Sequence, residues 1–179
     1  NGTVGQDISH ILPVLNLPTE KNSVIRGEFI IPRVVFEEKY KTRFANARNM
    51  VSGIVNSKKI DEKAKDLHFV AYEVIQPSLK PSEQMKRIEE LGHLLVQNQT
   101  VDNLTNEMLS GILMDWRTNY EYEIDGVIVT NDRIYTRTDG NPDYAFAFKM
   151  VISDQVAEAK VVDVIWTPSK SGYLKPRVR

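Results

Sequence analysis

The change in hydrophobic pattern along the chain is the feature that most constrains its fold. In the middle of the 179 residues, apolar side chains recur at helical spacing, first after Ser82 and then over Thr105–Arg117. From Gly126 onwards the pattern becomes short apolar runs separated by turn sequences, over residues 126–130, 134–136, 144–150 and 159–166. Helices followed by short strands predict an α+β fold with largely antiparallel sheets and helices outside.

The first half of the chain predicts two strands and two short helices. Apolar and β-branched residues favour strands over 23–31 and 67–75, and Pro32 and Pro77 follow them closely. Helical spacing favours helices over 35–43 and 49–56. We expect Ser82 to cap the next helix, with Met85, Ile88, Leu91 and Leu95 on its apolar side.

Composition narrows the class of protein. No stretch approaches the roughly 18 apolar residues of a membrane span, so no membrane partner is expected. The first residues are polar and glycine-rich, unlike a signal peptide, and the chain has no cysteine. These features predict a cytoplasmic protein in a reducing compartment. Its histidines, His10, His68 and His93, lack metal-ligand spacing and are expected to be surface or packing residues.

Charge is unevenly distributed, although the formal net charge is only −1. The last twenty residues carry five basic side chains, from Lys160 to Arg179, against the single acid Asp163. Together with Trp166 and Tyr173, they have the composition of a surface that contacts a phosphate backbone. A solvated terminal strand or linker is the simpler interpretation, and the composition favours it.

Five motifs in fixed order carry the information about function. They are Ile25-Arg26-Gly27-Glu28, Phe44-Ala45-Asn46-Ala47-Arg48-Asn49, Phe69-Val70-Ala71-Tyr72, Tyr122–Val129 around Asp125-Gly126, and Tyr144–Lys149. This ordered set resembles the adenylation (nucleotidyltransferase) domain of NAD-dependent DNA ligases. Residues 1–7 look like the glycine-rich loop that follows the family's nucleophile motif.

The resemblance implies a fold, a reaction and partners. The fold is the nucleotidyltransferase, ATP-grasp-like fold. Residues 1–165 are then a partial adenylation domain, and residues 166–179 a linker towards an oligonucleotide-binding domain absent from this chain. In the implied reaction a lysine takes AMP from NAD with Mg²⁺, the adenylate passes to the 5′-phosphate of nicked duplex DNA, and a 3′-hydroxyl displaces AMP. Such an enzyme serves DNA replication and repair.

The resemblance assigns three residues to the adenylate. Glu28 matches the strand glutamate that contacts the ribose, and Tyr72 matches the aromatic residue stacked on adenine. Lys149 matches the lysine that reaches the AMP phosphate. Without the motifs, Tyr72 would be interpreted as a core tyrosine and Lys149 as a solvated lysine at a strand end. Tyr144, Phe146 and Phe148 alternate before Lys149, so the face of the strand on which Lys149 lies decides between these interpretations.

Three further residues match positions on the phosphate side. Arg48 matches an arginine that acts on the phosphate or the DNA, and Arg117 an arginine eight residues before the motif aspartate. Asp125 matches that aspartate, placed near the phosphate and the metal. Prepositioned cations and Mg²⁺ are what this chemistry requires, because charge builds up on phosphoryl oxygens.

The chain departs from the family pattern in several places. Thr130 stands where the family has a lysine that contacts adenine, and Asn56 where it has a second arginine. Ala47 replaces a proline. No Lys-x-Asp-Gly nucleophile motif occurs, and Arg137-Thr138-Asp139-Gly140 is expected to be a turn, because a guanidinium is not a usable nucleophile.

Three hypotheses remain open from the sequence. The leading one is part of an NAD-dependent DNA ligase, inactive alone, whose missing N-terminal segment is supplied in cis or in trans. The second is a non-catalytic nucleic-acid-binding or scaffold subunit that retains the ligase fold; the presence of Glu28, Asp125 and Lys149 disfavours it. The third is an ATP-dependent ligase or a capping guanylyltransferase, which residues 44–49 and 123–126 disfavour.

Overall fold

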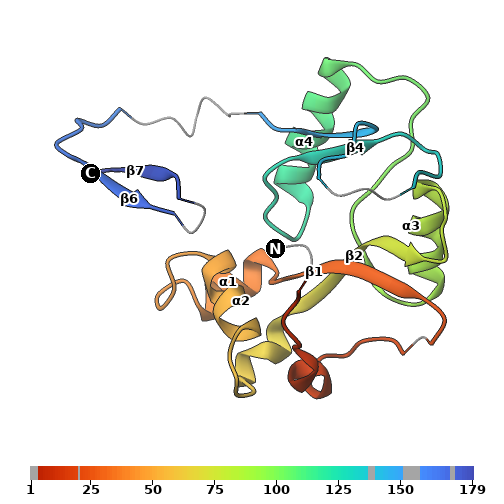
Figure 1. Cartoon of the computed structure of the whole chain (residues 1–179), viewed down its shortest axis with the longest axis horizontal. Helices are drawn as coiled ribbons and strands as arrows, with labels where there is room; N and C mark the ends of the chain where they lie inside the picture. Colours follow the sequence, from red (N-terminus) through yellow and green to blue (C-terminus); the bar gives the residue numbers. More distant parts are fainter. Residues whose placement is uncertain (1–3, 20, 137–139, 151–157, 170–171) are drawn as a thin grey trace. The chain divides into compact units, whose positions relative to one another are not determined.

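The computed structural model describes residues 4–19, 21–136, 140–150, 158–169 and 172–179. It divides into two compact units, Asn1–Lys149 and Met150–Arg179. The first unit combines helices with small sheets, so the expected α+β class is confirmed at this level (Figure 1). In the described part of the chain, none of the helices is both long and apolar enough to span a membrane.

A three-stranded sheet forms the centre of the first unit. Strand β1 (Val24–Ile30) pairs antiparallel with β2 (His68–Gln76), as the sequence predicts, and β2 pairs in parallel with the short β3 (Leu94–Leu95). Leu95 therefore belongs to a strand and not to the preceding helix. A tight turn at Gly92, with φ of 77°, ends the helical pattern and redirects the chain.

Two short helices lie beside the sheet, to the left of β1 and β2 in Figure 1. Helix α1 (Arg33–Lys39) begins directly after Pro32, and α2 (Ala47–Val55) begins after Asn46, whose side chain accepts a hydrogen bond from the Asn49 N–H. A 3₁₀ helix, η2 (Glu62–Asp66), follows. Their apolar sides form the larger hydrophobic core, which contains Ile31, Phe36, Tyr40, Met50, Val51, Ile54, Ala64 and Leu67.

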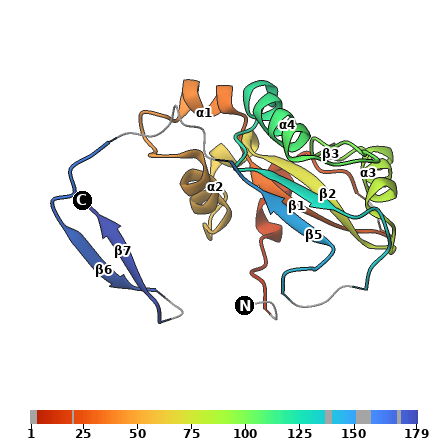
Figure 2. The same ribbon diagram turned by 90° about the horizontal axis from the view of Figure 1, so that it is seen from above.

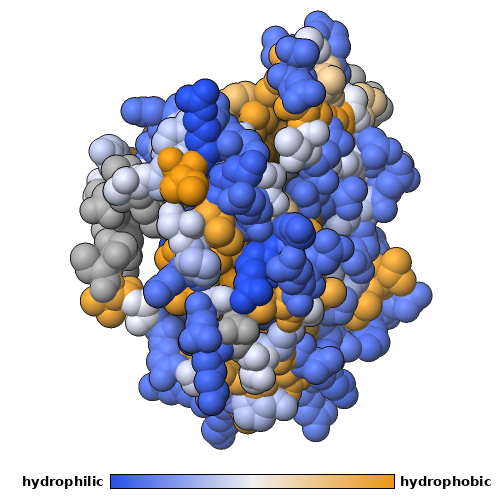
Figure 3. All heavy atoms as spheres, turned by 90° about the vertical axis from the view of Figure 1, so that its right-hand side faces the viewer, coloured by the Kyte–Doolittle hydropathy of each residue, from blue (hydrophilic) through white to orange (hydrophobic). Residues whose placement is uncertain are grey.

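Helix α3 (Pro81–Glu90) covers one face of the sheet. Its Ile88 is fully buried against Ala71 and Val74, and Met85 packs beside them. The helix begins one residue earlier than expected, because Pro81 supplies a fixed φ for the first turn. Ser82 is not the cap: its N–H and hydroxyl both donate to Asp132 at 2.8 Å. Seen from the α3 side, the surface is largely hydrophilic with separate apolar areas (Figure 3).

Helix α4 (Asn106–Asn119) is held at its C-terminal end by Arg33 at the start of α1. Thr105 caps the N-terminus, and Leu109 and Leu113 are buried. The Arg33 guanidinium donates to the carbonyl oxygens of Arg117, at 3.0 Å, and Thr118, at 3.1 Å. It also donates to Tyr120. Because helix ends leave carbonyls without partners, this clamp fixes where α4 stops.

Removing the clamp is expected to destabilise the protein. Arg33→Ala leaves the terminal carbonyls of α4 without their charged donor, at a cost of about 1–3 kcal/mol in the free energy of unfolding. The melting temperature should fall by a few degrees, measured by circular dichroism. Val34→Ala, at an exposed neighbouring position, serves as the control. An unchanged melting temperature for Arg33→Ala would show that water replaces the guanidinium without loss.

A second sheet follows α4. Strand β4 (Val127–Thr130) pairs antiparallel with β5 (Ala145–Phe148), within the ranges expected from the sequence. Residues 134–136, expected to be a strand, are irregular; instead the Tyr135 ring stacks on Tyr144, with centroids 3.9 Å apart. Apart from Gly140, the expected turn over residues 137–140 lies outside the described residues.

The second unit contains an antiparallel pair, β6 (Val164–Pro168) and β7 (Leu174–Val178). The expected strand over 159–166 starts only at Val164, and the sequence did not predict β7 as a separate strand. All ten strand residues are exposed. Among them, Trp166, Lys175 and Arg177 belong to the basic and aromatic tail.

Candidate active site

Asp125 stands at the centre of the predicted phosphate-side residues. Its carboxylate Oδ2 lies 3.1 Å from a guanidinium nitrogen of Arg48, at the start of α2. Its carbonyl oxygen accepts a 2.7 Å hydrogen bond from Arg117, in the last turn of α4. Three residues separated by up to 77 positions thus meet at the loop that precedes β4.

The Arg48–Asp125 pair lies open to solvent, with 78% and 61% of the two side chains exposed. An ion pair so exposed contributes only about 0–1 kcal/mol to folding. The contribution of this pair to stability therefore does not explain why an arginine and an aspartate occupy these positions. An exposed cluster of one carboxylate and two guanidinium groups is suited to contacts with a charged ligand.

Lys149 closely approaches Gly126, the residue that follows Asp125. Gly126 faces Lys149 across the β4–β5 pair, one step beyond the Val127–Phe148 pairing. A Cβ atom placed on Gly126 would lie 2.5 Å from the Phe148 carbonyl oxygen and 2.8 Å from Cγ of Lys149. Only glycine fits this position. Because Gly126 has no side chain, the aliphatic part of the Lys149 side chain can lie directly over it.

The same strand pair places Thr130 relative to Lys149. Side chains alternate along β4, so Ile128 and Thr130 share one face, and their partners on β5 are Ala147 and Ala145. Continuing this alternation puts Lys149 on the same face. Thr130 therefore lies on the Lys149 side of the sheet.

Glu28 and Tyr72 form a second group, on β1 and β2. Both are exposed. Gly27, before Glu28, lies close to the neighbouring strand β2, and Ala71, before Tyr72, packs against α3. The register between β1 and β2 shifts at Tyr72, because Arg26 pairs with Glu73 and Gly27 with Ala71. Tyr72 is the extra residue of a β-bulge, a feature that re-aims a side chain and is common next to binding sites.

The two groups are tied together by contacts near Asp125. The Tyr122 hydroxyl and the Nδ1 atom of His68 are 2.6 Å apart, and His68 opens β2 opposite Ile30 of β1. The Arg33 N–H also donates to the Glu121 carbonyl at 2.9 Å. In Figure 1 the β4–β5 pair lies above β1–β2, and in Figure 2, seen from above, the two pairs overlap.

The histidines make structural contacts. Besides the contact of His68 with Tyr122, Nε2 of His10 lies 2.7 Å from the Ser57 carbonyl. The His93 ring packs edge-on against Phe69, and burial lowers the pKa of His93. Over the described ranges, no group of three or more histidine or carboxylate side chains is arranged to hold a metal ion.

Asp125 is the predicted metal contact among the site residues, and it does not lie in such a group. A single exposed carboxylate fits Mg²⁺ only where phosphate oxygens and water complete the coordination, which is common for this ion. Two concavities of the described surface, of about 510 and 530 Å³, are lined by none of the six predicted site residues.

Two positioning features were not anticipated from the sequence. Arg33 holds the end of α4 from more than 80 residues away, and nothing in the local pattern indicates that contact. Gly126 lies inside the Tyr122–Val129 motif, and a glycine between an aspartate and a strand is a local indication of close backbone approach.

Comparison with known proteins agrees with this architecture. Residues 1–152 match the model of the NAD-dependent DNA ligase adenylation domain. The DNA ligase of Acanthamoeba polyphaga mimivirus is 40% identical over 189 residues; the match covers 100% of this chain and 29% of that protein. The 205R DNA ligase homologue of Invertebrate iridescent virus 6 is 35% identical, with coverage of 99% and 31%.

The chain thus spans less than a third of the length of these viral relatives. The family match extends over most of the chain and includes all six predicted site residues, from Glu28 to Lys149. The resemblance seen in the five ordered motifs is confirmed, and the chain belongs to the NAD-dependent DNA ligase adenylation domain family.

Proposed function

We propose that this chain is the adenylate-binding and DNA-end-binding part of an NAD-dependent DNA ligase with the nucleotidyltransferase fold. The complete enzyme seals nicks in duplex DNA through enzyme-adenylate and DNA-adenylate intermediates. In this proposal residues 1–165 form a partial adenylation domain and residues 166–179 lead towards a further domain. The meeting of Arg48, Arg117 and Asp125 beside Lys149 is the observation that carries it.

In the proposed site, the exposed side chains on β1 and β2 hold the adenosine. Tyr72 stacks on the adenine, and its place in a bulge turns the ring out of the regular ladder. Glu28 accepts hydrogen bonds from the ribose hydroxyls. Stacking and ribose contacts are the same before and during phosphoryl transfer, so these residues mainly supply binding.

The residues around Asp125 act on the phosphate. Lys149 places an ammonium near the α-phosphoryl oxygens, where negative charge develops as AMP is transferred. Arg48 and Arg117 supply further N–H donors on the side of the DNA 5′-phosphate. Mg²⁺ would shield the phosphoryl oxygens, with Asp125 as its contact in the protein. The Asp125 carboxylate also orients the Arg48 guanidinium.

A lysine nucleophile must complete the reaction. Because Lys-x-Asp-Gly is not found in these 179 residues, we propose that an N-terminal segment supplies it in cis or in trans. The alternative is a non-catalytic DNA-binding subunit that keeps the ligase fold. The exposed Arg48–Asp125 pair argues against it, since a scaffold gains little stability from that pair.

Adenylyl transfer from labelled NAD tests the proposal. With Mg²⁺, this chain alone should remain unlabelled, because it has no positioned lysine nucleophile. A longer protein that adds the nucleophile segment should acquire an acid-labile label and seal nicked duplex with NAD but not with ATP. DNA binding without label or sealing would favour the scaffold alternative. Labelling of the chain alone, or sealing with ATP, would contradict the proposal.

A further inference from the structure

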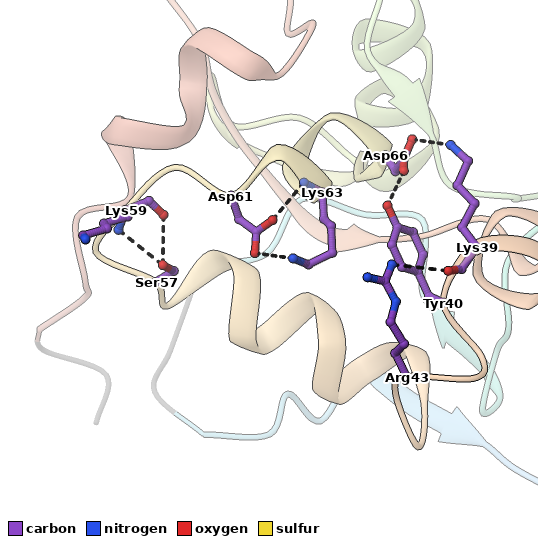
Figure 4. Close-up of polar contacts among 8 residues, drawn as sticks. All are labelled: Lys39, Tyr40, Arg43, Ser57, Lys59, Asp61, Lys63 and Asp66. Atoms are coloured by element: carbon purple, nitrogen blue, oxygen red, sulfur yellow. Dashed lines mark hydrogen bonds and ion pairs between the residues drawn. The ribbon is translucent and has the colours of Figure 1, made fainter.

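A basic concavity lies on the first unit, apart from the predicted site residues. It has a volume of about 510 Å³ and lies between the end of α1 and the segment that follows α2. Its lining residues are Tyr40, Arg43, Ser57, Lys59, Ile60, Asp61, Glu62, Lys63 and Lys65. Four of them are cations and two are acids. Figure 4 shows that Arg43 and Tyr40 come from one side, and Ser57, Asp61 and Lys63 from the other.

Asp61 and Asp66 are neutralised by local contacts, which leaves Glu62 at the exposed rim as the acid that offsets part of the positive charge. Asp61 pairs with the Lys63 ammonium at 2.7 Å and accepts from the Lys63 N–H at 2.9 Å, and these hydrogen bonds lower its pKa. Behind the concavity, Asp66 is occupied by Lys39 and by the Tyr40 hydroxyl. For Arg43, Lys59 and Lys65, the described residues provide no carboxylate partner within ion-pair distance. The concavity therefore carries an excess of positive charge.

Arg43 is held in place without an acid. Its guanidinium lies 5.6 Å from the centre of the Tyr40 ring, and one nitrogen is 3.5 Å from the Lys39 carbonyl oxygen. Burial raises the pKa of Tyr40 to about 12, so its ring stays neutral and is fixed by the hydrogen bond to Asp66. A positioned guanidinium with unused N–H donors is a ready partner for a phosphate oxygen.

We propose that this concavity is a second DNA-contact surface, in which Arg43, Lys59 and Lys65 bind phosphodiester groups of the duplex backbone away from the nick. That the ligand is DNA rests on the proposed function, whereas that it is a phosphate group rests on the positive charge and the N–H donors of the concavity. Helix α2 joins the two regions, with Arg48 at its start and Lys59 beyond its end. With nine residues at 1.5 Å each, α2 is roughly 14 Å long. This length corresponds to about four nucleotide steps along one DNA strand.

Salt-dependent binding of a fluorescent nicked duplex to this chain tests the surface. A triple variant in which glutamine replaces Arg43, Lys59 and Lys65 should bind the duplex about tenfold more weakly, or weaker still, at roughly 100 mM salt. The slope of log K against log salt should fall in magnitude by about two to three, near one per lost phosphate contact. Nicked and intact duplexes should lose affinity equally, because the contacts are to the backbone.

A matched triple variant controls for net charge. Lys21→Gln, Lys86→Gln and Arg87→Gln remove the same charge from the loop before β1 and from α3, outside the concavity. This variant should keep its salt slope within about one. If it loses as much affinity and slope as the first variant, or if the first variant binds as the unmutated chain does, the proposal is overturned.

A variant that adds positive charge tests the surface through tighter binding, which a misfolded protein would not produce. Glu62→Lys at the exposed rim should tighten binding and steepen the salt slope by about one, whereas Glu83→Lys on α3 should not. Weaker binding by Glu62→Lys would overturn the proposal. Nick sealing by the longer protein tests the proposed function separately: lost sealing with an intact salt response would reject the ligase role and leave the phosphate surface standing.

Discussion

Replacing Lys149 with alanine is expected to slow adenylyl transfer and nick sealing by about 100-fold or more in a protein that combines this chain with the nucleophile segment. In the proposed site, the ammonium lies where the transferring phosphoryl group gains negative charge, so its contribution should be larger in the transition state than in the ground state. Loss of one such donor typically costs two to three orders of magnitude in rate. The half-saturating NAD concentration should change little.

Steady-state sealing over a range of NAD concentrations separates Lys149 from Tyr72. Tyr72→Ala should raise the half-saturating NAD concentration, since stacking is worth about 1–3 kcal/mol per base and is shared by ground and transition states. Thr130→Lys restores a cation on the Lys149 face and should tighten NAD binding or have little effect. Sealing by Lys149→Ala at the unmutated rate would make Lys149 a surface lysine and invalidate the proposed site.

Element types were predictable from the sequence where the apolar period was clear. The β1 and β2 strands, α2 and α4 fall within two residues of their expected ends. The errors occur where a tertiary contact decides the structure. Asp132 draws Ser82 away from the capping role, and the turn at Gly92 assigns Leu95 to a strand beside β2. Residues 134–136 alternate like a strand, but Tyr135 stacks on Tyr144 instead.

For the candidate site, the order of the motifs predicts which residues take part but not how they are arranged. Arg48 and Asp125 lie 77 positions apart, and no local pattern predicts that their side chains pair. The bulge at Tyr72 arises from the register between β1 and β2, which depends on both strands at once. The convergence of Glu28 and Tyr72 with Lys149 on one adenylate stays a prediction.

Gly126→Ala is expected to reduce the sealing rate by roughly 100-fold, although Gly126 has no reactive group. The added methyl meets the Phe148 carbonyl oxygen at 2.5 Å and Cγ of Lys149 at 2.8 Å. The backbone atom belongs to a paired strand, so the lysine stem and the end of β5 must both move. A displacement of about 1 Å at a reacting centre is enough for a loss of this size.

The control must separate displacement from unfolding. Overpacking at Gly126 should also cost about 1–3 kcal/mol of stability, so the melting temperature is measured for every variant and the rate is corrected for the folded fraction. Gly111→Ala is the matched change: it lies within α4, where an added methyl meets nothing within 4 Å. Alanine should stabilise that helix and leave the rate unchanged. If Gly126→Ala lost activity only in proportion to its unfolded fraction, the glycine would serve the strand pair alone, and the placement of Lys149 over Asp125-Gly126 would have no part in adenylyl transfer.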